Sequence, residues 1–293
     1  MKKRPAILMA LLCLAPALII LFTFQIYPAI KIFFMSTYTE YNYMKHIVYK
    51  VGGDNFVTLF SDPKFLLALK NTIILALCVV PLSILLALFF SLLLAEKSPL
   101  KDFIRSIYFL PFVTSTIAIS AVWRWIFHSK AGLLNYFLGF LGVQPIQWLT
   151  NPKWAMVSLI ILSVWKSLGY NILIFVVGLR NIDERYYLAA RLDGASRFQI
   201  IRRITLPLLS PSIFFVSITS LISSFKVFQE VYSLFAKSAG PLDSCLTVVY
   251  YIYDSLTNQY LYGLSAAASV VLFLIILLVT ILQLRIGKKR VNY

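Results

Sequence analysis

Residues 180–211 of the chain read RNIDERYYLAARLDGASRFQIIRRITLPLLSP, a basic segment with an apolar run on either side. The segment contains six Arg and no Lys. A helical pattern interrupted at Asp193-Gly194 predicts two short helices, over roughly 184–192 and 196–204, joined by a turn at the glycine. We expect such a loop to lie at a membrane surface, where its arginines bind lipid headgroups or its helices contact a partner protein.

The composition is that of an integral membrane protein. Of the 293 residues, 60% are apolar and 13% are charged, and the mean hydropathy is +0.84. Soluble domains are less apolar and about twice as charged. No polar stretch is long enough to form a separate soluble domain, so we expect residues 1–293 to form a single transmembrane domain.

Six apolar runs are long enough to cross a bilayer, which requires roughly 20 helical residues. A β-barrel would instead show short strands of alternating polarity. The expected fold class is therefore an all-α polytopic membrane protein with six transmembrane helices. The first run contains a cleavage-like Ala15-Pro16-Ala17 but continues well beyond it, which favours a span over a signal peptide. The runs cover residues 6–30, 72–95, 107–127, 154–179, 208–233 and 262–284.

The distribution of Lys and Arg predicts the orientation of these spans. With the N-terminus inside, the cytoplasmic segments carry sixteen of these residues and the outer loops carry seven. Because cytoplasmic loops are enriched in Lys and Arg, both termini and the loop 180–208 are expected in the cytoplasm. The net charge of +16 is thus a topology signal, and no basic polar domain indicates nucleic-acid binding.

No pattern in the sequence predicts an enzyme. There is no Walker A motif and no HExxH motif, and the His and Cys residues are too dispersed to predict a metal site or a disulfide framework. Cys13 and Cys78 lie in predicted spans, whereas Cys245 lies in an outer loop and should be open to a thiol reagent from outside. We expect no catalytic residue, metal or cofactor in this chain, so any energy that its activity needs must come from a partner.

Polar side chains inside two of the spans mark a candidate substrate path. Four of them in the fourth span follow the i, i+3, i+4, i+7 spacing of one helix face. Such residues usually face a cavity or a neighbouring helix, and hydroxyls with an aromatic ring suit a neutral polyol. The alternative is packing between helices. The candidate residues are Ser163, Lys166, Ser167, Tyr170, Ser220 and Ser224. A further pair, Lys226 and Glu230, is spaced i, i+4 and is expected to form its own ion pair.

The loop 180–208 resembles the signature of the permease subunits of bacterial ABC importers. That signature reads EAA, a short gap, DGA, and then I-x-LP. The chain has Leu188-Ala189-Ala190, Asp193-Gly194-Ala195, Ile204 and Leu206-Pro207, so that Leu188 replaces the family's Glu. The resemblance implies the type I permease fold, with this loop as a coupling helix that docks on an ATPase. The residues implied in coupling are Leu188, Ala189, Ala190, Asp193, Gly194, Ala195 and Arg197.

Weaker matches to the family extend over nearly the whole chain: Gly53-Asp54-Asn55-Phe56, Asn71-Thr72, Leu110-Pro111, Trp123-Arg124-Trp125 and Gly132-Leu133-Leu134-Asn135. Residues 225–230, Gly240-Pro241, Thr247 and residues 250–253 resemble the carbohydrate branch, similar to the maltose-type permeases. The resemblance implies import of a carbohydrate, expected to be an oligosaccharide, across a bacterial plasma membrane. The implied partners are a second permease subunit, an ATPase dimer that binds ATP and Mg²⁺, an extracytoplasmic solute-binding protein and membrane lipid.

Two other functions remain open from the sequence. A permease of the same family could carry another small solute, such as an amino acid, a sugar phosphate or an acidic sugar. A protein of a different class, an ion-coupled secondary transporter, should show broken helices in paired halves and buried carboxylates for the coupling ion. Glu230 is the one carboxylate within the predicted spans, and it has Lys226 one turn away.

Overall fold

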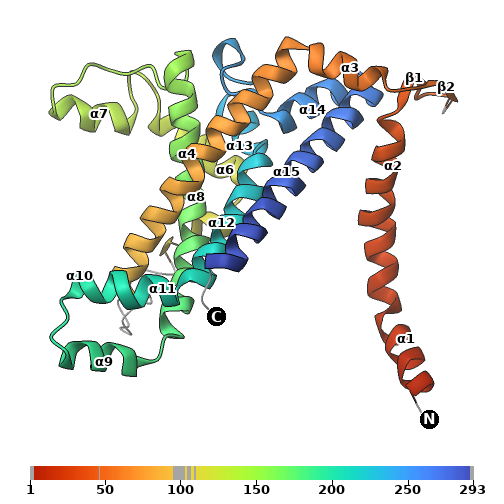
Figure 1. Ribbon diagram of the computed structural model, residues 1–293. Helices are drawn as coiled ribbons and strands as arrows, with labels where there is room; N and C mark the ends of the chain where they lie inside the picture. The colour runs from red at the N-terminus through yellow and green to blue at the C-terminus, as the bar shows by residue number, and fades with distance from the viewer. Residues whose placement is uncertain (1–2, 46, 95–102, 104–106, 109, 291–293) are drawn as a thin grey trace. The chain divides into compact units, whose positions relative to one another are not determined.

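The computed structural model describes residues 3–45, 47–94, 103, 107–108 and 110–290, which are mainly helical (Figure 1). The chain divides into two compact units. The first unit contains residues 1–65 and 251–274, and the second contains residues 66–250 and 275–293. The helices α4 (Pro63–Leu94), α14 (Val248–Thr257) and α15 (Tyr262–Arg290) each contribute residues to both units.

The first unit begins with helical segments that follow one another without a break. They are α1 (Lys3–Leu21), a π-helical turn (Phe22–Ile26) and α2 (Tyr27–Met35). Next comes an antiparallel hairpin of β1 (Tyr38–Asn42) and β2 (Ile47–Val51), which the all-α prediction did not include. Helix α3 (Asp54–Ser61) follows. Its Asn55 amide donates hydrogen bonds of 2.9 Å to the carbonyls of Ser36 and Tyr38, and so fixes the join between α2 and β1.

The second unit contains the remaining helices. These are α6 (Thr116–Ile126), α7 (Leu133–Phe140), α8 (Pro152–Arg180), α9 (Glu184–Leu192), α10 (Arg197–Ile200), a π-helical turn (Ile201–Thr205), α11 (Leu206–Leu208), α12 (Ser210–Phe225) and α13 (Gln229–Leu234), followed by a 3₁₀ turn (Pro241–Asp243). Helices α9 and α10 lie at the opposite end of α8 from α7 (Figure 1).

The helical, multi-span class is confirmed, whereas the count of six spans stays a prediction. Four helical stretches among the described residues are long and apolar enough to cross a membrane: Cys13–Met35, Pro63–Leu94, Pro152–Arg180 and Tyr262–Gly287. A fifth would be the pair Arg197–Leu208 and Ser210–Phe225, which is bent by 65°. In the predicted third run, α6 has 11 residues. It is therefore about 17 Å long, shorter than the hydrocarbon core.

An apolar cluster joins α4, α8 and α12 in the second unit. Its buried members are Ala87, Leu94, Ile172, Phe175, Val176, Leu179, Leu209 and Val216. Gly178 allows a close approach of α8 to α12, because a Cβ at this position would lie 2.5 Å from the Ser212 hydroxyl. The cluster fixes the cytoplasmic half of α8, as the predicted orientation defines it, against the start of α12.

Polar side chains near the other end of α4 hold the loop that precedes α14. The Asn71 amide donates to the carbonyls of Leu246 (3.1 Å) and Asp243 (3.3 Å). The Thr72 hydroxyl accepts from the backbone N–H of Val248 at 3.0 Å. The Asn71-Thr72 motif therefore has a structural role.

Asn135 of α7 holds together the segments that precede and follow this helix. Its amide donates to the carbonyls of Ser129 and Ile146, and its oxygen accepts from the N–H of Ile146 and from the indole N–H of Trp148. Asn135 and Trp148 are both buried. A single side chain thus satisfies four backbone and side-chain groups.

Asn135→Ala should lower the thermal midpoint of the purified protein, because each buried polar group left unsatisfied costs about 1–3 kcal/mol. Gln144→Ala, an exposed position in the same loop, is the matched control and should leave the midpoint unchanged. Thermal unfolding in detergent, followed by tryptophan fluorescence, measures both. Equal midpoints for the two variants would contradict the role assigned to Asn135.

Cys245 is buried, contrary to its predicted accessibility. Its side chain is fully enclosed, and burial raises the pKa of the thiol to about 12. The loop folds back on itself here, with the Cys245 N–H donating to the Ala239 carbonyl at 2.9 Å. Since the thiolate is the reactive form, native Cys245 should label slowly at pH 8 and faster as the pH rises toward 12.

The orientation is therefore better tested with two exposed positions in a cysteine-free background. Ser238→Cys lies in the loop predicted to be outside, and Leu192→Cys lies in the loop predicted to be cytoplasmic. A membrane-impermeant maleimide added to intact cells should label Ser238→Cys, and should label Leu192→Cys after the cells are opened. The reverse pattern would overturn the predicted topology.

Candidate functional site

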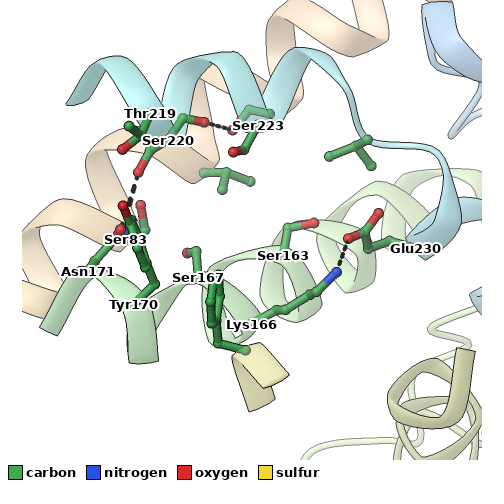
Figure 2. A pocket seen from close by; sticks show the side chains of 14 residues that line it. Ser83, Ser163, Lys166, Ser167, Tyr170, Asn171, Thr219, Ser220, Ser223 and Glu230 are labelled. Atoms are coloured by element: carbon green, nitrogen blue, oxygen red, sulfur yellow. Dashed lines mark hydrogen bonds and ion pairs between the residues drawn. The ribbon is translucent and has the colours of Figure 1, made fainter. Parts of the chain in front are cut away.

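A cavity of about 400 Å³ lies in the second unit (Figure 2). This volume is within the range of small-molecule binding pockets. Residues of α4, α8 and α12 contribute most of the wall, together with the segment that leads into α13. The lining residues are Val79, Ser83, Phe112, Ser163, Lys166, Ser167, Tyr170, Asn171, Thr219, Ser220, Ser223, Ser224, Val227 and Glu230.

All six residues predicted for the substrate path line this cavity. The four from the fourth span lie on α8, and Ser220 and Ser224 lie on α12, so the helical spacing brings each set to one face. Several hydroxyls bond to their own helix, as in Ser167 to the Val164 carbonyl and Ser224 to the Ser220 carbonyl, both at 2.8 Å. The predicted residues thus meet in one place.

The predicted substrate-path set did not include several other polar residues of the same wall. Asn171, which is next to Tyr170, donates from its amide to the Ser220 hydroxyl at 3.4 Å and so links α8 to α12. Ser83, Thr219 and Ser223 complete the hydroxyl-rich surface (Figure 2). An Asn within an apolar run could have been noticed in the sequence as a polar residue inside the membrane. Asn171 does not, however, belong to the i, i+3, i+4, i+7 set that contains Lys166.

The predicted Lys226–Glu230 ion pair is wrong. Helix α12 ends at Phe225, and Phe228 has φ −141° and ψ −55° before α13 begins, so the two residues do not share a helix. The Glu230 carboxylate instead accepts from the Lys166 ammonium, with Nζ 2.7 Å from Oε1. The ammonium also donates to the Thr116 hydroxyl at 2.6 Å.

The Lys166 ammonium joins three helices. It lies on α8, pairs with Glu230 of α13 and donates a hydrogen bond to Thr116 of α6. A second link between α6 and α13 is the Arg124 guanidinium, which donates to the Ser233 carbonyl. The Arg124 side chain is therefore used within the protein. The break at 226–228 allows α13 to bring Glu230 to the cavity.

An aromatic pair forms one side of the cavity. The rings of Tyr170 and Phe112 are stacked, with centroids 5.1 Å apart and planes 23° apart. Their faces and edges offer an apolar surface beside the hydroxyls. Carbohydrates present the same combination of apolar ring faces and hydroxyl groups.

The basic segment forms two helices joined by a tight turn, as predicted. Helix α9 has the predicted bounds, and α10 continues through the π-helical turn into α11. At the turn the N–H of Ala195 donates to the Ala190 carbonyl, and the N–H of Gly194 donates to the Arg191 carbonyl. This is the Schellman arrangement, which requires a positive φ at the residue after the cap. Gly194 supplies it, with φ +75°.

Both helices begin with a side-chain cap. Asp183 accepts from the Arg185 N–H at the start of α9, and hydrogen bonds from the Arg185 side chain and backbone lower the pKa of this carboxyl. Ser196 and Gln199 form a reciprocal capping box at the start of α10. Local interactions therefore define the shape of this loop.

The exposed surface of the loop is more apolar than its arginines suggest. Leu188 is 50% exposed, and two residues that the sequence did not single out, Leu192 and Phe198, are 89% and 71% exposed. Of the residues implied in coupling, Ala190 is buried and packs inward, and Ala195 is half-buried. The others are exposed: Leu188, Ala189, Asp193, Gly194 and Arg197.

Among the described residues, no group of three His, Cys, Asp or Glu side chains could hold a metal ion. The charged groups of the cavity are the paired Lys166 and Glu230. The site is therefore suited to binding and passage of a polar molecule.

Comparisons with known proteins agree with this geometry. Residues 79–292 match the family described as binding-protein-dependent transport system inner membrane component. The lactose transport system permease protein LacF of Rhizobium radiobacter is 36% identical, over 93% of this chain and 90% of that protein. The trehalose/maltose transport system permease protein MalF of Thermococcus litoralis is 30% identical, over 99% and 97%.

A solved structure is similar over the same extent. It is a bacterial ABC transporter involved in the import of the acidic polysaccharide alginate. The superposition has a TM-score of 0.82 with 25% identity, and covers 99% of this chain and 98% of the other.

Proposed function

We propose that this chain, which belongs to the family of binding-protein-dependent transport system inner membrane components, moves an oligosaccharide through the cavity between α8 and α12. It is a multi-pass permease subunit of a carbohydrate ABC importer, with the type I permease fold. Family membership decides against an ion-coupled secondary transporter.

The hydroxyl-rich cavity with its stacked aromatic pair is the observation that supports a carbohydrate as the transported solute. Sugars bind through hydrogen bonds to hydroxyl and amide groups and through contact of their apolar faces with aromatic rings. The wall offers both, from Asn171, Tyr170 and the serines of α12. A permease for amino acids would need partners for an ammonium and a carboxylate, whereas the charged groups here are bonded to each other.

The second part of the proposal assigns the loop 180–208 to an ATPase. Its Leu188, Leu192 and Phe198 are exposed apolar side chains in a segment rich in arginine, which suits insertion into a groove of a partner. We assign ATP and Mg²⁺ to a dimer of such partners, and no catalytic residue to this chain. A second permease subunit and an extracytoplasmic binding protein complete the importer, and the loop and both termini lie in the cytoplasm.

The mechanism follows from this division of labour. The binding protein delivers the sugar to the outer end of the permease pair. Closure of the ATPase dimer on ATP moves the loop, and α8 and α12 move with it because the apolar cluster around Leu179 and Leu209 joins them to the loop's ends. The helices then turn the cavity from one side of the membrane to the other.

Tyr170→Ala tests the cavity. Removal of the ring should lower sugar uptake about tenfold or more, since an aromatic contact contributes on the order of 1 kcal/mol beyond the area that it buries. Tyr136→Ala, an exposed tyrosine of α7 outside the cavity, is the control. Uptake of labelled sugar into proteoliposomes, normalised to assembled complex, measures both. Unchanged uptake by Tyr170→Ala would refute the assignment of the cavity.

Gly194→Pro tests the coupling loop. Proline fixes φ near −65°, which is incompatible with φ +75°, and removes the N–H that bonds to Arg191. Transport per ATP hydrolysed should fall, while membrane insertion persists.

Gly142→Pro is the matched control, because Gly142 also has positive φ (+76°) and open space around its Cβ but lies in the loop after α7. It should leave the ratio of transport to ATP hydrolysis unchanged. Normal coupling in Gly194→Pro would exclude the loop as the docking site.

A further inference from the structure

Two of the residues that line the cavity are charged, and they neutralise each other. Lys166 and Glu230 form an ion pair at 2.7 Å (Figure 2). The ammonium also donates to the Thr116 hydroxyl. The other polar lining residues carry hydroxyl or amide groups. Among the described lining residues, a ligand that enters the cavity therefore meets no isolated cation.

The pair is required at this depth in the membrane. Lys166 is the midpoint of α8, with fourteen residues of the helix on each side. Each half is about 21 Å long, so the ammonium lies near the bilayer centre if α8 crosses the membrane. A charge at this depth is costly without a partner. The carboxylate and the hydroxyl from α13 and α6 compensate for that cost.

A neighbouring hydroxyl is available for a ligand. Ser163, one helical turn from Lys166, is 8% exposed, and its Oγ has no hydrogen-bond partner among the described residues. It lines the same cavity. A sugar hydroxyl can bond to this group and leave the ion pair intact.

We propose that the Lys166–Glu230 pair restricts the cavity to uncharged sugars; this inference rests on the proposed function. A sugar carboxylate, sulfate or phosphate that binds Lys166 must displace Glu230. It would leave a second negative charge buried without its partner, which is strongly unfavourable. Specificity then comes from the exclusion of the wrong ligand as much as from contacts with the right one.

The fold itself does not decide whether a permease carries charged or uncharged sugars. The alginate importer, which is named for an acidic polysaccharide, has the same fold with 25% identity. Side chains, not the fold, must therefore distinguish charged from uncharged cargo. Had Glu230 paired with Lys226, Lys166 would have been available to a sugar acid.

The experiment measures equilibrium binding to the purified membrane complex, with both permease subunits and the ATPases but without the binding protein. Omission of the binding protein removes its own selectivity. The probes are labelled maltose and maltotriose, and digalacturonate and trigalacturonate as acidic sugars of equal length. Wild type should bind the neutral sugars at least about tenfold more tightly.

Glu230→Gln frees the Lys166 charge and should shift the ratio of dissociation constants toward the acidic sugars by about tenfold or more. The double variant Lys166→Met/Glu230→Gln has no charge in the cavity and should regain the neutral preference. Ser223→Ala, a hydroxyl of the same wall, is the control and should change neutral and acidic binding alike.

The outcomes separate the two proposals. Wild type that binds acidic sugars as tightly as neutral ones, or a ratio that Glu230→Gln leaves unchanged, overturns the role of the ion pair while the carbohydrate function stands. Wild type that binds none of the four sugars contradicts the proposed function. Wild type without a neutral preference overturns the role of the ion pair even if the single variant does not assemble.

Discussion

Lys166, at the midpoint of the 29-residue apolar helix α8, requires partners from the helices around it. An ammonium in a low-dielectric environment needs a counter-charge and further hydrogen bonds, or it costs several kcal/mol. Lys166 obtains them from Glu230 and Thr116. To deliver Glu230, the chain must leave the helix after Phe225 and start α13 at a new angle. The break in the predicted fifth span therefore accompanies the pairing of this charge.

Local interactions made much of the structure predictable. The bounds of α9, the turn at Gly194 and the start of α10 follow from caps and a glycine whose partners are within five residues. The polar face of α8 follows from helical spacing alone. In these places sequence neighbours are also the interaction partners, so periodicity and motif are sufficient.

The wrong predictions share a different cause, because they concern residues whose partners lie far away in the sequence. Lys226 and Glu230 have the spacing of an ion pair, but Glu230 bonds to a residue 64 positions away. Cys245 lies in a loop and was expected at the surface, yet the loop folds over it and closes with bonds to Asn71 of α4. Leu192 and Phe198, on the two helices joined by the turn, are exposed. Each outcome depends on tertiary packing, which local patterns do not encode.

The cavity and the basic loop are connected through α8. From Lys166 to the end of α8 at Arg180 is fourteen residues, about 21 Å of continuous helix with no proline in this part. Its last turns pack against Leu209 and Val216 of the segment that returns from the loop. Gly178 brings α8 close to Ser212, so that the two helices meet with little space for independent movement.

Closely packed helices move as rigid bodies. Under the proposed mechanism, a displacement of α9 and α10 would therefore be carried to both walls of the cavity. Local caps give the loop a fixed shape, and a long-range ion pair gives the cavity its charge balance. Because the same two helices connect these features, the proposed movement of the loop would change access to the cavity without breaking the Lys166–Glu230 pair.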